Sequence, residues 1–180
     1  GAARACKRRE VPARRTAAGS GRSAASYSSR AMAFEGVQDL IIDTDMSIDV
    51  DDVGMLCAAH ALADLGEARI LAVVHDSAAV HGIGAVSVIN RYYGRDGILL
   101  GAYKGTIGAP GARSANPAIF NEGRGWYVRT LVDSFPSAVT NISEVPSARR
   151  VYRRALESSD DGSVTIVAVG FLTVSYTHLT

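Results

Sequence analysis

The chain has 180 residues, of which 47% are hydrophobic, and this size and composition suit one globular domain with its own core. Its net charge of +1 hides an asymmetry: residues 1–33 carry eight basic side chains and one acidic one, whereas the remainder carries eleven basic and seventeen acidic ones. The acidic remainder argues against nucleic-acid binding by the folded part, no apolar run is long enough to span a bilayer, and two cysteines make no disulfide framework.

The first 33 residues differ in composition from the rest of the chain. They are rich in Ala, Arg, Ser and Gly and hold few large apolar residues before Met32. Such a segment buries too little apolar surface to offset its ordering entropy, so we expect a disordered basic leader. Three interpretations stay open: an organelle transit peptide within residues 1–31, a basic tail that contacts nucleic acid, or a translated leader ahead of a start at Met32. For the domain itself we expect a reducing compartment, the cytoplasm by default.

From Phe34 onward, apolar runs alternate with helical periodicities. Residues 39–43 read as a buried strand, and residues 50–65 follow with a helical pattern that Gly66 ends. The other expected strands are 69–75, 98–103 and 163–169, the other expected helices are 83–93, 126–134 and 147–158, and residues 109–124 are expected to form a loop. Strands that alternate with helices predict an α/β fold, a Rossmann-like open and mostly parallel sheet with flanking helices.

Several side chains are expected to serve the structure rather than the chemistry. Ser147 follows a proline and precedes a helical pattern, so it is a predicted helix N-cap. Tyr92 and Tyr93 are expected to pack in the interior, and Cys57, which lies among apolar helix positions, is expected to be an inert core thiol.

An acidic cluster follows the first expected strand. Five carboxylates stand within ten residues: Asp43, Asp45, Asp49, Asp51 and Asp52. Like charges this close repel one another, and a folded protein usually keeps such a cluster because a cation lies in it. Since carboxylates without Cys or His favour a hard ion, the pattern indicates Ca²⁺ or Mg²⁺. The carboxyl ends of parallel strands share one sheet edge, where open α/β sheets bind ligands.

Three other interpretations of the cluster were weighed. An EF-hand loop needs Gly at its sixth position and Glu at its twelfth, but a count from Asp43 finds Ile48 and Gly54, which excludes it. A Mg²⁺-dependent Asp-x-Asp phosphatase, similar to the haloacid dehalogenases with Asp43 as nucleophile, stays open, although it does not call for Asp51 and Asp52. A solvated acidic helix start explains the acids of the helix but not the two on the strand side.

The chain resembles the inosine–uridine-preferring nucleoside hydrolase family. That family opens with a strand and an Asp-x-Asp-Pro-Gly-x-Asp-Asp motif, and here Asp43-Thr44-Asp45 and Asp51-Asp52 stand in the same frame with two extra residues between them. The likeness runs from Gly36 to Thr173 and includes the segments 90–95 and 163–173. The resemblance implies a Ca²⁺-dependent enzyme that hydrolyses the N-ribosidic bond of nucleosides to free base and ribose.

The resemblance also assigns roles to individual residues. Asp45 would bind Ca²⁺ and act as the base toward the metal-bound water, and Asp52 would be the bidentate calcium ligand. Asp51 would hold ribose hydroxyls, while the backbone carbonyl of Thr173 would complete part of the metal shell.

Three further acids complete the assignment. Asp43 would support the site from behind, and Asp76, with His75 at the end of the second strand, would contact ribose or orient an acid. Asp49 has no counterpart in the short motif, so its role stays open. The partner would be a small-molecule nucleoside, and the usual family assembly would be a homodimer or homotetramer.

The resemblance ends before the chain does. Residues 174–180 do not continue the family pattern, and we expect them to be an aberrant tail after an N-terminal part of a nucleoside hydrolase-like domain at 34–173. The family draws further ligands from its C-terminal half, so we expect an incomplete sheet and a fragment. A catalytically inactive module that binds Ca²⁺ or a ribosyl ligand is the non-enzyme alternative.

Overall fold

A computed structural model describes residues 36–47, 49–105 and 127–171, all of which belong to the unit Phe34–Thr180. The predictions for the basic leader, for the loop at 109–124, for Thr173 and for the tail at 174–180 lie outside the described residues.

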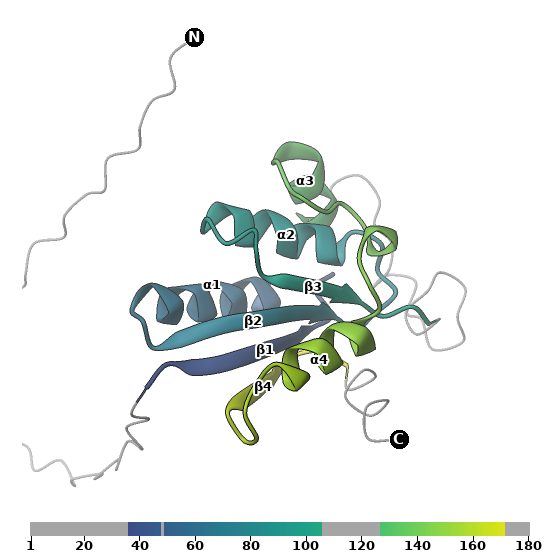
Figure 1. Ribbon diagram of the computed structural model, residues 1–180. Helices are drawn as coiled ribbons and strands as arrows, with labels where there is room; N and C mark the ends of the chain where they lie inside the picture. Colours follow the sequence, from purple (N-terminus) through teal and green to yellow (C-terminus); the bar gives the residue numbers. More distant parts are fainter. Residues whose placement is uncertain (1–35, 48, 106–126, 172–180) are drawn as a thin grey trace, which may run out of the picture. The chain divides into compact units, whose positions relative to one another are not determined.

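Four parallel strands form one sheet in the described part of the chain (Figure 1). They are β1 (Gln38–Thr44), β2 (Ala68–His75), β3 (Leu99–Ala102) and β4 (Val164–Ala168). Their spatial order is β3-β2-β1-β4, and every pairing is parallel. The predicted parallel α/β fold is therefore confirmed at the level of its sheet and flanking helices.

Four α-helices and one 3-10 helix connect the strands. They are α1 (Asp51–Asp64), α2 (Gly82–Tyr92), α3 (Tyr127–Ser134), η1 (Ile142–Glu144) and α4 (Ala148–Glu157). The side chain of Ser147 accepts a hydrogen bond from the backbone N–H of Arg150, which confirms the predicted N-cap. Gly66 follows α1 with φ +75°, a left-handed conformation that glycine adopts without strain.

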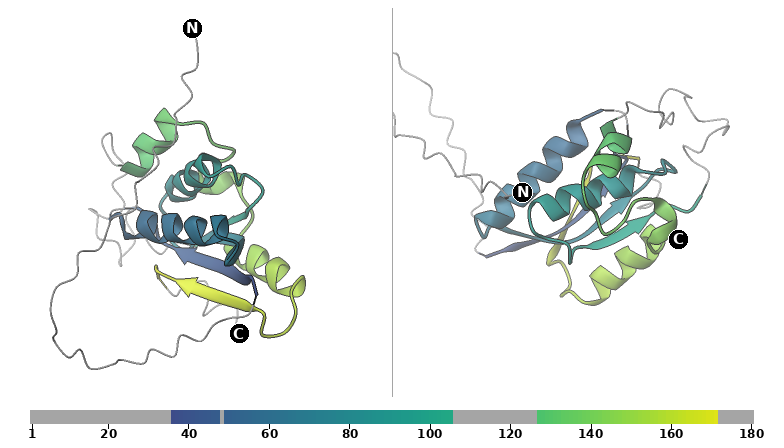
Figure 2. Two further views of the ribbon diagram at one scale, coloured as in Figure 1. Left: turned by 90° about the vertical axis from the view of Figure 1, so that its left-hand side faces the viewer. Right: turned by 90° about the horizontal axis from the view of Figure 1, so that it is seen from above.

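The core has two layers, one on each face of the sheet. Leu40, Ile42 and Val73 pack on one face with side chains of α1 and α2, and Ile41 and Val74 pack on the other face with α4. Figure 2 shows α1 and α2 together on one side of the sheet and α4 on the opposite side. Because side chains are buried on both faces of the sheet, β1 and β2 contain continuous apolar runs in the sequence.

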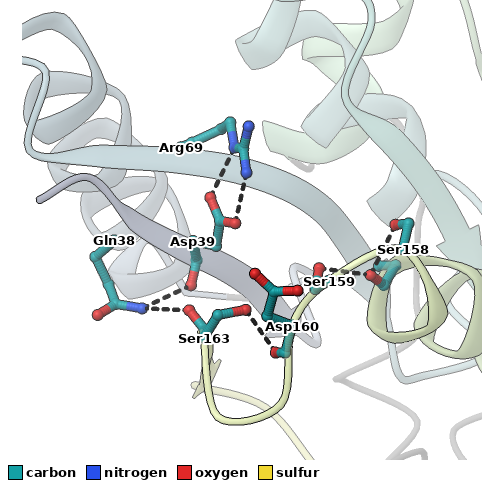
Figure 3. A network of polar contacts seen from close by, with 8 residues as sticks. Gln38, Asp39, Arg69, Ser158, Ser159, Asp160 and Ser163 are labelled. Atoms are coloured by element: carbon teal, nitrogen blue, oxygen red, sulfur yellow. Dashed lines mark hydrogen bonds and ion pairs between the residues drawn. The ribbon is translucent and has the colours of Figure 1, made fainter.

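The amino-terminal edge of the sheet is closed by polar side chains (Figure 3). Two nitrogens of Arg69 donate hydrogen bonds to the two carboxylate oxygens of Asp39, at 2.7 and 2.6 Å. Gln38 donates to the backbone oxygen of Ser163 at 3.0 Å and so ties β1 to the start of β4. The charge of Asp39 therefore has a partner of the opposite sign.

Two expectations about individual residues are wrong. Tyr92, expected in the interior, is 84% exposed at the end of α2. Cys57 is a free thiol that is only partly buried, beside an apolar hollow between the helices. Helical periodicity placed both residues on the correct helices but did not predict how far their side chains are exposed.

None of the described helices combines the length and the apolar character that a membrane crossing needs.

Candidate metal and active site

The acidic cluster lies where the direction of the strand order reverses. The chain runs outward from β1 through β2 to β3 and then returns to the other side of β1 as β4. In open α/β sheets, ligands bind outside the carboxyl ends of the strands at this switch point. Asp43 lies on β1 near that end, and the backbone N–H of Val169, just past β4, donates to its carbonyl oxygen at 2.9 Å. The fold therefore brings the acids to the end of the sheet where a ligand is expected.

Asp43 and Asp76 form a buried acid pair at the base of the site. Both side chains are fully buried, and Tyr152 of α4 donates its hydroxyl to Asp43 Oδ2 at 3.1 Å. Burial raises the pKa of Asp43 to about 6, against the hydrogen bonds from Tyr152 and Asp76 that lower it. Burial, followed by the charge of Asp43, raises the pKa of Asp76 to about 9. Near neutral pH the pair therefore retains a proton, which Asp76 contributes to the hydrogen bond between the two carboxyl groups.

Asp52 is a buried carboxylate with one free oxygen. It lies in the first turn of α1 and is 1% exposed. Its Oδ1 accepts a hydrogen bond from the hydroxyl of Thr44, which in turn accepts from the backbone N–H of Met46 at 3.2 Å. Its Oδ2 is buried and has no hydrogen-bond partner among the described residues. Burial raises the pKa of Asp52 to about 7, and the charges of Asp45, Asp51 and Asp49 raise it further.

The more open side of the cluster consists of Asp45, Asp49 and Asp51. Asp45 is half-buried, and burial, with the charges of Asp49 and Asp51, raises its pKa. Asp49 and Asp51 are exposed. Oxygens of Asp49, Asp51 and Asp52 all lie within 4.8 Å of one another. This spacing assigns Asp49, whose role the sequence left open, to the same group as Asp51 and Asp52.

No basic side chain neutralises these acids within the described part of the chain. Ion pairs there join other residues, and none includes Asp43, Asp45, Asp49, Asp51 or Asp52. The buried oxygen of Asp52 without a partner and the three raised carboxylate pKa values would both be relieved by a bound cation. Because every donor is a carboxylate oxygen, the set fits a hard divalent ion.

Two glycines allow the loops to close around the site. A Cβ at Gly170 would lie 2.5 Å from the backbone nitrogen of Asp45 and 2.7 Å from Asp76 Oδ2. A Cβ at Gly82 would lie 2.1 Å from Nε2 of His75. His75 is fully buried and its ring nitrogens lie 3.2 Å from the carbonyl oxygen of Met46 and 3.0 Å from that of Ser77. Burial lowers the pKa of this imidazole to about 4, so near neutral pH the ring is neutral and its single N–H donates to one of these two carbonyl oxygens.

Tyr127 is a site residue that the sequence did not indicate. It begins α3, and its hydroxyl is buried without a hydrogen-bond partner among the described residues. Burial raises its pKa, and so do the charges of Asp52, Asp49, Asp51 and Asp45, which places the phenol near the acidic cluster. Only the three-dimensional path of the chain brings this residue there, so no local sequence signal marks it.

The structure thus brings together most of the residues that the sequence selected. Asp43, Asp45, Asp51, Asp52 and Asp76 all lie at one edge of the sheet. Asp76, expected to contact ribose, is fully buried beside Asp43 and below Gly170. The predicted ligand Thr173 lies outside the described residues.

Comparisons with protein-family models, with curated proteins and with solved structures gave no match.

Proposed function

We propose that this chain carries the metal-binding part of a Ca²⁺-dependent nucleoside N-ribohydrolase. One observation carries the proposal: carboxylates from β1, from the loop after it and from α1 meet at the switch point, with no basic partner among the described residues. The resemblance of Asp43-Thr44-Asp45 and Asp51-Asp52 to the nucleoside hydrolase motif supports the choice of reaction.

Asp52, Asp49 and Asp51 are the residues whose spacing suits the ion, with Asp45 beside them. Bound Ca²⁺ would supply the charge that orients a water and lowers its pKa. Asp49 thereby enters the proposed ligand set in addition to Asp45, Asp52 and Thr173, which the resemblance selected.

The remaining chemistry depends on the acids themselves. Asp45 is half-buried with a raised pKa, so it is suited to accept a proton from water near neutral pH. Cleavage of an N-ribosidic bond develops positive charge on the sugar, and a crevice lined by carboxylates stabilises that charge. Asp51 is exposed and free to accept hydrogen bonds from ribose hydroxyls.

The surroundings of Asp43 favour this reaction over a phosphatase. A phosphatase nucleophile must reach the phosphorus atom, whereas Asp43 is fully buried and hydrogen-bonded to Tyr152 and Asp76. These contacts suit a supporting acid that holds the floor of the site in place.

The test is release of ribose from inosine and uridine, measured as reducing sugar with Ca²⁺ and with EDTA. We expect release that requires Ca²⁺ and that Asp45→Asn abolishes. Asp39→Asn is the matched control, because it changes an aspartate of the same strand at the opposite edge of the sheet. Calcium binding without ribose release would instead identify a binding module, and a Mg²⁺-dependent phosphoryl-enzyme at Asp43 would identify a phosphatase.

A further inference from the structure

Helix α4 presents four arginines to solvent on a single face. Arg149, Arg150, Arg153 and Arg154 are all exposed, whereas the other side of the helix buries Ala148, Val151, Tyr152 and Ala155 against the sheet. At 3.6 residues per turn, these four positions cover one arc of the helix, opposite the buried arc. We call these four residues the arginine face.

The arginine face has one acid beside it on the helix, Glu157, which follows Arg153 by four residues and is exposed. None of its four side chains takes part in an ion pair with a described residue, and the first turn of α4 holds no acidic residue. Like charges at i and i+4 repel, and Arg149 and Arg150 stand in the first turn, where the helix dipole disfavours cations. These repulsions are unfavourable in the free protein, and an anion bound to the arginine face would relieve them.

The arginines border a concave surface as well as a charged one. Ser147, Arg149, Arg150 and Arg153 line a hollow of about 370 Å³ at the start of α4. Several guanidinium groups beside one hollow can donate paired N–H groups to the oxygens of a phosphate. We infer that the arginine face binds a small phosphate-bearing ligand with more than one negative charge, at a site separate from the acidic cluster.

Acids at both ends of α4 set the size of this ligand. Glu144 precedes the helix, and Glu157, Asp160 and Asp161 end and follow it, all exposed (Asp160 is drawn in Figure 3). A ten-residue helix is about 15 Å long. A nucleic-acid strand or a polyanionic surface that extended past either end would meet these carboxylates. A diphosphate or the diphosphate end of a nucleotide fits between them.

The experiment is calorimetric titration of the whole chain with inorganic pyrophosphate, at low ionic strength and with EDTA so that no divalent ion bridges to the acidic cluster. We expect saturable binding that the double variant Arg149→Ser, Arg153→Ser weakens at least tenfold. The control double variant Arg91→Ser, Arg129→Ser removes the same charge from exposed or half-exposed arginines elsewhere and should change the affinity less than twofold. Asp52→Asn should also leave it unchanged, which separates this site from the proposed calcium site.

Two further measurements decide what the arginines do. The double variant at 149 and 153 should melt within a few degrees of the parent chain, because the repulsion it removes offsets the lower helix propensity of Ser. A fall in Tm of more than about 10 °C would show a structural role and overturn the inference. A lack of saturable pyrophosphate binding, equal loss in the control variant, or tighter binding of a single-stranded oligonucleotide than of pyrophosphate would overturn it too.

Discussion

Asp39 and Asp43 lie four residues apart on β1, toward opposite edges of the sheet, and they differ in the side chains that contact them. At the amino-terminal edge, Asp39 is buried and accepts two hydrogen bonds from Arg69, whose side chain is exposed. At the carboxyl-terminal edge, Asp43 is fully buried, and its partners are Tyr152 and a second acid, Asp76.

This contrast separates an acid that serves the fold from acids that reduce its stability. The carboxylate of Asp39 has both oxygens bound by a guanidinium that stays in contact with water, so its charge is balanced and the pair does not destabilise the folded state. Buried carboxylates without a counter-charge destabilise the folded state until they are protonated or bind a cation. This contrast supports the proposal that a ligand bound at the carboxyl-terminal edge stabilises the folded protein.

The largest expected effect comes from Gly170, where the site closes. Gly170→Ala places a Cβ 2.5 Å from the backbone nitrogen of Asp45, so the end of β4 must move away from the acids. We expect a loss of about 1–3 kcal/mol in the free energy of unfolding and a fall in Ca²⁺ affinity of more than tenfold. Urea unfolding and calorimetric Ca²⁺ titration measure the two effects.

Gly97→Ala is the matched control for this change. Gly97 precedes β3 at the opposite edge, and a Cβ there would meet nothing within 4 Å. Equal losses of Ca²⁺ affinity in the two variants would mean that the close approach at Gly170 does not shape the site.

The next effect is a fall of stability with rising pH that cation binding removes. In the ion-free protein, burial raises the pKa of Asp43 to about 6, that of Asp52 to about 7 and that of Asp76 to about 9. Groups with a raised folded-state pKa stabilise below their unfolded value of 3.8 and lose that contribution as the pH rises. His75 has its pKa lowered from 6.5 to about 4, so its contribution to stability increases as the pH rises, but only below pH 6.5.

Between pH 6.5 and about 9 the carboxylates alone decide the sign, so Tm measured in EDTA should fall as the pH rises. Saturating Ca²⁺ should remove the fall, because the ion favours the ionised carboxylates. The rise in Tm on adding Ca²⁺ should therefore grow with pH. A Ca²⁺ shift that is the same at both ends of this range would argue against a site made of these acids.

The sequence was sufficient to predict every described strand and α-helix to within about two residues, because apolar runs, Gly66 and Ser147 are local signals. It also predicted that the acids share one edge, which follows from parallel strands. It did not indicate the contact between Tyr152 and Asp43, which are 109 residues apart, or the approach of Tyr127 to the acids. Such contacts depend on which strand lies beside β1 and on how a helix is oriented against the sheet. Local periodicity in the sequence determines neither.

A smaller effect is expected from Asp52→Asn in the ion-free protein. The amide can still accept the hydrogen bond from Thr44, while the buried charge and its repulsion by Asp45 and Asp51 are removed. At about pH 8 we expect the free energy of unfolding in EDTA to rise by about 1–2 kcal/mol, together with loss of the Ca²⁺-dependent gain in Tm. A variant that is less stable in EDTA would show that the Asp52 carboxylate serves the fold.

The smallest effect, and the opposite sign, is expected from Asp39→Asn. This substitution removes the charge that Arg69 contacts, so it should lower Tm by no more than a few degrees, and less at high salt, because the Arg69 side chain is exposed to screening ions. Ca²⁺ affinity should stay unchanged, since the side chain lies at the edge of the sheet away from the acidic cluster. Asp39→Asn and Asp52→Asn make the same chemical change at opposite edges of the sheet. Thermal melts of the two variants in EDTA therefore compare the effect of that change at each edge. If both variants shift Tm in the same direction, then the acids at the two edges have the same effect on stability. In that case the acids at the carboxyl-terminal edge do not need a cation to balance their charge.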